Sequence, residues 1–304
     1  MQALVIGYGS IGARHARLLE ALGHEVRCVS ANPDCQHRKY STINKALDHF
    51  SPELIIIANR TVDHFASLDT VIKAGYSKQV LVEKPLFDKQ YDISSWNHDN
   101  ITVAYNFRHH PISQKVMNLL TDKTIHSARF HVGQYLPDWR PGTDYTNSYS
   151  ANRTQGGGVL RDLSHELDLA LWLLGPWKRV VAIGGHFSNL DIDSDDQYSL
   201  LMETELCPVV SVHMDYLNRT ARRGFDIHAD GISLHADFIT GFLEINGKPE
   251  QYQLDRDTTY SAQIQAITSG DYQNQCSLEQ GLMVVQLINA IETSASKSTW
   301  IKAE

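Results

Sequence analysis

The sequence predicts an α/β protein of two domains, the first with a parallel sheet covered by helices and the second with a largely antiparallel sheet. Two observations lead to this fold class. Up to about residue 107, short apolar strands without alternation are separated by amphipathic helices, which is typical of a parallel sheet buried on both faces. After that point, strands follow one another with turns between them. We therefore expect domains at 1–107 and 108–304, a division that fits a chain of 304 residues.

The elements of the first domain follow in order along the chain. Strands are expected at 3–7, 25–30, 53–59, 79–85 and 101–107. Helical patterns separate them at 10–23, 42–50 and 61–75, with a polar helical stretch between the last two strands.

The second domain is expected to begin with a helix at 111–122 and a strand at 127–137. A turn-rich stretch at 138–158 leads into one strong helix at 159–175. Strands then follow at 179–187, 197–205, 209–217, 224–231 and 232–239, and a helix at 277–296 closes the chain.

Composition excludes several classes of function. The net charge of -8 and a pI near 6.0 give no electrostatic footprint for nucleic acid or an anionic membrane. A hydrophobic fraction of 42% argues against disorder. The four cysteines form no CxxC pair, and no apolar run approaches the ~20 residues that cross a bilayer. Since the first residues already form a strand rather than a signal peptide, we expect a cytoplasmic protein in a reducing compartment.

The segment "GYGSIG" at 7–12 is a GxGxxG placed directly between a strand and a helix. In this context Gly7 permits a tight turn, Gly9 lets the backbone approach a pyrophosphate, and Gly12 lets the helix pack on the strand. The amides of Ser10 and Ile11 open that helix. The segment therefore predicts a Rossmann domain that binds a dinucleotide.

The second strand lacks the carboxylate that grips the ribose hydroxyls of NAD in many such domains. Its end reads Ser30-Ala31-Asn32, and Ser30 and Asn32 can bind a hydroxyl or a phosphate. Arg38 and Lys39 can reach a phosphate or be solvated surface. NAD and NADP both remain open, and the missing carboxylate favours NADP.

The helix at 159–175 follows a glycine triplet and has a polar side. On a continuous helix, Asp162, His165 and Asp168 fall opposite a leucine face. A solvated polar face is the ordinary interpretation, but glycine lets backbone approach another group closely and favours a site. We predict no metal site: "DIDSDD" at 191–196 lacks the glycine and glutamate of a calcium loop, and His109-His110 before proline indicates a helix start.

With these motifs, the chain resembles the Gfo/Idh/MocA oxidoreductases, the family of glucose–fructose oxidoreductase and inositol dehydrogenase. The resemblance covers essentially the whole chain and includes "ANRTVDHFASL", "VLVEKPL", "AYNFRHHP" and "GGGVLRDLSHELD". It implies that the second domain has an open sheet that often supports dimers or tetramers. It also implies cofactor contacts from Asn59, His64, Glu83, Lys84 and Pro85.

The resemblance implies that Lys84 and His165 are catalytic. Lys84 ends a Rossmann strand, and Pro85 biases it to an extended backbone that aims its ammonium outward. His165 corresponds to the family's catalytic histidine and Asp162 to its substrate-binding aspartate. The family usually has one residue more between these two, and the shorter spacing would turn Asp162 by about 100° on a helix.

The stretch at 133–151 resembles a subgroup found with surface-polysaccharide and amino-sugar synthesis genes. Its rings can stack on a sugar or base, and its arginines can bind carboxylate or phosphate. An ordinary structured loop is the alternative interpretation. The substrate-binding candidates are Tyr135, Trp139, Arg140, Tyr145, Tyr149 and Arg153.

The resemblance predicts hydride transfer between a nicotinamide and a sugar or nucleotide-sugar derivative, with the protein forming homo-oligomers. Two alternatives stay open. One is reduction of a non-sugar carbonyl or an imine-like bond, as in biliverdin reductases. The other is a non-catalytic cofactor sensor that binds a partner protein; the presence of both Lys84 and His165 favours catalysis over sensing.

Overall fold

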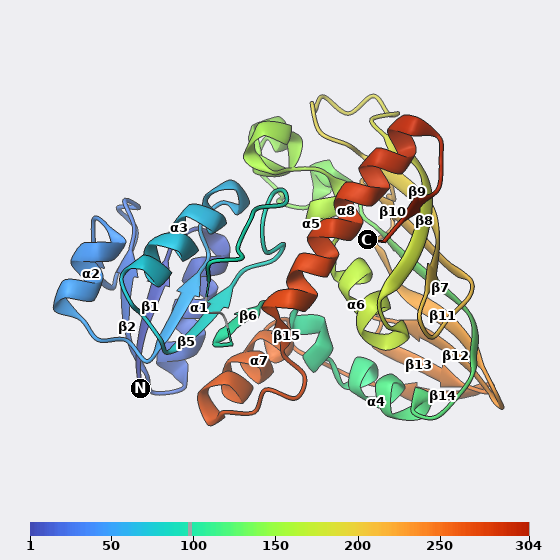
Figure 1. Ribbon diagram of the computed structural model, residues 1–304, viewed down its shortest axis with the longest axis horizontal. Coiled ribbons are helices and arrows are strands. Elements are labelled where there is room, and N and C mark those ends of the chain that lie inside the picture. The colour runs from blue at the N-terminus through green and yellow to red at the C-terminus, as the bar shows by residue number, and fades with distance from the viewer. Residues whose placement is uncertain (97–98, 304) are drawn as a thin grey trace. The chain divides into compact units, whose positions relative to one another are not determined.

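The computed structural model describes residues 1–96 and 99–303, and the chain divides into two units (Figure 1). The first unit comprises 1–109 and 256–282, and the second comprises 110–255 and 283–304. The segment 256–282 thus returns to the first unit, and the chain then goes back to the second unit, where residues 301–302 add the last strand of its sheet. The boundary falls inside α8 (Leu278–Lys297).

The first unit is built on a seven-stranded sheet in the order β15-β6-β5-β4-β1-β2-β3. The six strands β1 to β6 are parallel, and their order is that of a Rossmann fold. Only β15 runs antiparallel, at the edge beside β6. The strands are β1 (Gln2–Ile6), β2 (Glu25–Val29), β3 (Arg38–Tyr40), β4 (Leu54–Ile57), β5 (Gln79–Val82), β6 (Ile101–Val103) and β15 (Cys276–Ser277).

Helices cover this sheet and complete its core. The helix α1 packs with α7, while α2 packs with α3. Apolar side chains of β1, β2 and β4 meet α1 and α7 in one buried cluster. Because such strands are buried on both faces, they read as continuous apolar runs. The helical elements are α1 (Ser10–Ala21), α2 (Ile43–His49), α3 (Thr61–Lys73), the 3₁₀ turn η1 (Asn106–His109) and α7 (Thr258–Ser269).

One expected element of this unit is wrong. Residues 88–96 form turns and loop rather than the polar helix that the sequence predicts. The rings of Phe87, Tyr91 and Trp96 instead gather around Phe65 of α3, with Tyr91 stacked at 4.0 Å. Aromatic packing against α3 therefore overrides the local helical pattern; 97–98 lie outside the described residues.

The second unit is built on a nine-stranded sheet in the order β14-β13-β12-β11-β7-β10-β9-β8-β16. All neighbours are antiparallel except β7 and β10, which confirms the mainly antiparallel sheet. The strands are β7 (Ile125–Gly133), β8 (Trp177–Gly185), β9 (Gln197–Thr204), β10 (Val210–Asp215), β11 (Arg222–Ala229), β12 (Ile232–Asp237), β13 (Phe242–Ile245), β14 (Lys248–Gln251) and β16 (Ile301–Lys302).

Helices cover one face of this sheet and leave the other open (Figure 1). Between β7 and β8 lie four 3₁₀ turns, η2 (Leu136–Asp138), η3 (Tyr145–Asn147), η4 (Tyr149–Ala151) and η5 (Arg153–Gln155), and then the helices α5 (Val159–Asp162) and α6 (His165–Leu174). The preceding helix α4 (Pro111–Leu120) begins as predicted, because His110 is its N-cap and accepts a hydrogen bond from the Ile112 amide at 3.2 Å.

Candidate functional site

The glycine loop between β1 and α1 is shaped for a dinucleotide. Gly7 has a φ of +95°, and a Cβ there would lie 2.5 Å from the backbone nitrogen of Asn59. A Cβ on Gly12 would lie 2.0 Å from the Gly7 carbonyl oxygen. These two glycines are required by the protein's own backbone, which brings the end of β4 against the loop and α1 against β1.

Gly9 differs from Gly7 and Gly12, the other two glycines of the motif, in the space around it. A Cβ on Gly9 would meet nothing within 4 Å. Gly9 is also the N-cap of α1, and no side chain caps this helix. The first amides of α1, which include those of Ser10 and Ile11, have no intrahelical acceptor. Open space beside exposed helix amides fits a pyrophosphate, so the residues present fit a dinucleotide.

The end of β2 has a network of its own. The Asn32 side chain donates to the Tyr8 carbonyl at 2.8 Å and accepts from the Asp34 amide at 2.9 Å. Ser30 Oγ accepts from the Asn32 amide at 3.0 Å, which leaves its hydroxyl proton for another acceptor. Lys39 Nζ donates to the Asn32 carbonyl at 3.1 Å. Asn32 therefore ties this loop to the glycine loop, while Ser30 and Lys39 are hydrogen-bond donors at the end of β2.

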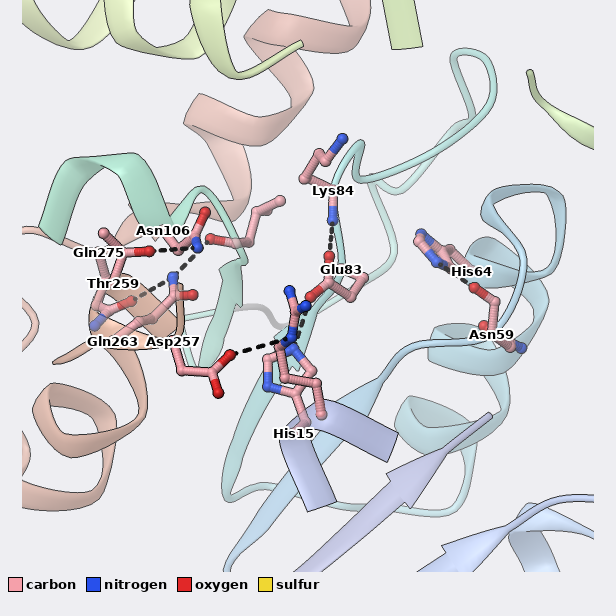
Figure 2. A network of polar contacts seen from close by, with 12 residues as sticks. His15, Asn59, His64, Glu83, Lys84, Asn106, Asp257, Thr259, Gln263 and Gln275 are labelled. Carbon is pink, nitrogen blue, oxygen red and sulfur yellow. Dashed lines mark hydrogen bonds and ion pairs between the residues drawn. The ribbon is translucent and has the colours of Figure 1, made fainter. Parts of the chain in front are cut away.

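Lys84 follows the carboxyl end of β5, where Glu83 continues the sheet by donating its amide to the Ile57 carbonyl. The Glu83 carboxylate is buried and accepts from His15 Nε2 at 2.7 Å and from the Lys84 amide at 3.1 Å (Figure 2). The Lys84-Pro85 peptide bond is cis. Glu83 thus holds the backbone of Lys84.

His64 of α3 lies under the same loop. Its Nδ1 is 3.1 Å from the Pro85 carbonyl and 3.2 Å from that of Leu86, and its Nε2 is 3.2 Å from the Asn59 carbonyl. Burial lowers the pKa of His64, although these carbonyls act in the opposite direction. In Figure 2, His64 and Asn59 lie together on the side of Lys84 away from Asn106. His64 therefore joins the loop after β4 to the loop that carries Lys84.

In the second unit, His165 begins α6, and the helix expected at 159–175 is broken. α5 ends at Asp162 and α6 begins at His165, with Leu163 and Ser164 between them. The rotation of about 100° expected for a continuous helix therefore does not apply. Nor is the polar side solvated: Asp162, His165 and Asp168 are all buried.

Asp162 is surrounded by tyrosine hydroxyls. Tyr149 donates to its Oδ1 at 2.5 Å and Tyr216 to its Oδ2 at 2.6 Å. Burial, and then the Asp162 charge, raise the pKa of both tyrosines well above the ordinary value, so both hydroxyls keep their protons. Trp139 contacts the Tyr216 ring edge-on at 5.2 Å. Asp162 therefore anchors the loop that the sequence singled out.

The other candidates of that loop have partners inside the second unit. The Tyr145 hydroxyl accepts from the Asp191 amide at 3.2 Å, and Arg153 donates to Asp193. The Arg219 guanidinium stacks on Tyr135 at 3.5 Å. Arg140 is exposed. The segment "DIDSDD" is thus a loop that binds neighbouring backbone and arginine.

Sequence reasoning missed two residues of these regions, His15 and Tyr216. His15 lies eight residues after Gly7 on α1 and is fully buried against Glu83. Tyr216 follows β10 and reaches Asp162 from 54 positions away. His15 sits at helical spacing from Gly12 and could have been suspected, whereas nothing local distinguishes Tyr216.

No helix among the described residues is long and apolar enough to cross a membrane. In the same residues, no group of three or more histidine, cysteine, aspartate or glutamate side chains could hold a metal ion.

Comparison of the sequence with known proteins gives one family model and one curated relative. The model of the GFO/IDH/MocA C-terminal domain matches residues 116–235. The putative oxidoreductase YteT of Bacillus subtilis (strain 168) is 25% identical over 151 residues, which is 47% of this chain and 35% of that protein. The chain thus spans about a third of the length of this curated relative.

Solved structures share the fold over the entire chain. Levoglucosan dehydrogenase in complex with NADH and levoglucosan is 18% identical, with a TM-score of 0.84 over 100% of this chain and 99% of that one. GenD2 from gentamicin A biosynthesis in complex with NAD is 20% identical, with a TM-score of 0.82 over 100% and 96%. The WlbA dehydrogenase from Bordetella pertussis, with NADH and UDP-GlcNAcA, is 16% identical, with a TM-score of 0.82 over 100% and 98%.

Proposed function

We propose that this chain, which matches the model of the GFO/IDH/MocA C-terminal domain over residues 116–235, is an enzyme of the Gfo/Idh/MocA oxidoreductase family. In this proposal it oxidises or reduces a sugar or a sugar derivative, nucleotide-linked sugars included, with a nicotinamide dinucleotide. One observation carries this proposal. The open glycine loop follows β1 and Lys84 follows β5, so both lie at the carboxyl ends of parallel strands in one sheet. Ligands of open α/β sheets bind at this edge. The first unit is then the dinucleotide domain and the second the substrate domain.

Each residue has a distinct role in this proposal. When bound, the dinucleotide supplies or accepts the hydride at its nicotinamide. The amides of Ser10 and Ile11 bind the pyrophosphate, and the Lys84 ammonium polarises the reacting oxygen of the substrate. His165 takes up or donates the proton, since a histidine exchanges protons near neutral pH.

Asp162 contributes through Tyr149 and Tyr216 rather than alone. Because these hydroxyls occupy its two oxygens, Asp162 holds the loop at 134–151 in place. Arg140, exposed on that loop, is the candidate for a carboxylate or phosphate group of the substrate. The relatives that bind levoglucosan and UDP-GlcNAcA support a substrate of the sugar class.

We further propose that NADP binds at least as well as NAD. The donors Ser30 and Lys39 stand at the end of β2, where Asn32 is occupied and no carboxylate accepts from ribose hydroxyls. Hydrogen-bond donors suit a 2′-phosphate. Calorimetric titration with each dinucleotide tests this assignment.

A homo-oligomer is proposed through the open face of the nine-stranded sheet. Ile183 of β8 is 76% exposed and Leu201 of β9 is 50% exposed, and they share a shallow pocket with Val181. Such apolar patches mark association surfaces. Light scattering on the wild type and on Leu201→Glu tests the proposal. The wild type should be a multimer, and the charge introduced in Leu201→Glu should dissociate it.

The experiment that tests the enzymatic function is a panel of sugars, polyols and nucleotide sugars with NAD and NADP, read at the nicotinamide absorbance. Non-sugar carbonyl compounds belong in the same panel. Turnover of a sugar is expected, with slower turnover in Lys84→Met while calorimetry still shows dinucleotide binding. A protein that binds dinucleotide but turns over nothing would be a sensor and would contradict the proposal.

A further inference from the structure

A buried histidine links α1 to the loop of Lys84. His15 is fully buried in the second turn of α1, and its Nε2 lies 2.7 Å from Glu83 Oε1. The other oxygen of Glu83 accepts from the Lys84 amide at 3.1 Å. Figure 2 shows the three residues in sequence, from the helix below to Lys84 above. One carboxylate therefore joins the helix that follows the glycine loop to the backbone of Lys84.

The environment of the ring decides which nitrogen carries the proton. Nδ1 of His15 is buried and has no hydrogen-bond partner among the described residues, so a proton there would lack an acceptor. Nε2 lies 2.7 Å from an oxygen of the Glu83 carboxylate, whose other oxygen accepts from the Lys84 amide, so a proton on Nε2 has an acceptor. A proton on Nε2 satisfies the short contact.

The ring itself is held on α1. Tyr260 of α7 contacts the imidazole edge-on, with ring centroids 5.8 Å apart. The same tyrosine lies under the Arg14 guanidinium at 4.9 Å, and Arg14 is paired with Asp257 at 3.3 Å. The returning segment 256–282 thus contributes an aromatic contact to the imidazole.

We propose that His15 is a positioning residue for Lys84: its Nε2–H holds Glu83 so that the second carboxylate oxygen anchors the Lys84 backbone. This role rests on the proposed function, because anchoring matters to catalysis only if Lys84 contacts the substrate. The anchor itself is a property of the protein without substrate. Without His15, Glu83 would be a buried carboxylate lacking one of its donors, free to leave the Lys84 amide.

Hydrogen exchange of the Lys84 amide, followed by NMR on the protein without ligands, tests the anchor directly. We compare wild type with His15→Leu, which keeps the volume but donates nothing, and His15→Gln, whose Nε2 can replace the imidazole donor. The Lys84 amide should exchange about tenfold faster or more in His15→Leu. In His15→Gln, the rate should return to within about threefold of wild type.

The Leu81 amide in β5 is the internal control, since it reports global opening. An equal acceleration at Leu81 and Lys84 would show that His15 only stabilises the fold, and an unchanged Lys84 rate would overturn the proposal as well. If His15→Leu does not fold, the ¹⁵N chemical shifts of the His15 ring in the wild type show which nitrogen carries the proton. A proton on Nε2 supports the anchor, and a proton on Nδ1 alone overturns it. None of these readings needs a substrate, so they stand apart from the outcome of the activity panel.

Discussion

Gly9 in the first unit and Gly157 in the second stand next to helices for opposite reasons. A Cβ on Gly9 would meet nothing within 4 Å, whereas one on Gly157 would lie 2.1 Å from the Tyr149 carbonyl oxygen. At Gly158, φ is +118° and a Cβ would lie 2.4 Å from Asp195 Oδ1. The first glycine borders open space, and the second lets the chain pack on itself.

The glycine triplet is expected to let the backbone approach another group closely, and at Gly157 and Gly158 that group is the protein's own chain. The second segment is filled by protein, and its function is to bring α5 and α6 to their positions. Val159 donates its amide to the Asp195 carbonyl, and the Asp195 side chain accepts from the Leu160 amide at 3.3 Å. The chemistry proposed for this region therefore belongs to His165 at the start of α6, not to the glycines.

The largest effect is expected from His165→Ala, which tests the chemistry of the second region. Loss of an acid/base group should lower the turnover rate roughly 10²–10⁴-fold. The acid-side limb of the pH–rate profile should vanish, because protonation of the imidazole would no longer switch off a base. Dinucleotide affinity, measured by calorimetry, should stay within a few-fold. Lys84→Met is the matched variant: it should slow turnover and keep the limb, and the reverse pattern would exchange the two roles.

Gly9→Val tests the open space of the first region. Two methyl groups would stand where the pyrophosphate is expected, so dinucleotide affinity should fall about 100-fold or more, a loss of about 2.7 kcal/mol. The melting temperature should not fall, since no protein atom is displaced. Unchanged affinity would show that the dinucleotide does not use this loop.

The same alanine substitution at both glycines sharpens the comparison in terms of stability. Gly157→Ala should destabilise the protein by about 1–3 kcal/mol, because its Cβ would overlap backbone carbonyls that cannot move aside cheaply. Gly9→Ala, with φ of -82°, should leave the free energy of unfolding nearly unchanged. Urea denaturation of the two variants measures both values. Equal losses would remove the distinction drawn between the two segments.

The smallest effect is expected from Ser30→Asp at the end of β2. A carboxylate there would repel a 2′-phosphate and accept from ribose hydroxyls, so preference should move toward NAD by about tenfold, or about 1.4 kcal/mol. The ratio of the two dissociation constants measures the change. Ser30→Asn is the neutral control and should shift the ratio less. If the wild-type protein already prefers NAD over NADP tenfold, the ribose is recognised by residues other than those at the end of β2.

Local patterns predicted most elements because each carries its own signal. Residues adjacent in sequence are enough to identify the apolar strand at 3–6, the glycine loop and the amphipathic α1. By contrast, the break between Asp162 and His165 lies within a helical pattern and carries no proline or glycine. The buried tyrosine hydroxyls on Asp162 come from before and after it in the chain, which local periodicity cannot reveal.

The sequence by itself determined the Rossmann sheet, the open antiparallel sheet and the positions of Lys84 and His165, because periodicity and short motifs encode them within a few residues of chain. Tertiary structure decided what the motif residues contact. In the folded chain, Asp162 accepts hydrogen bonds from two tyrosines and Glu83 contacts His15. The segment 256–282 belongs to the first unit. A buried polar group needs a partner wherever the fold can supply one, and that partner is set by the packing of distant segments rather than by the neighbouring letters.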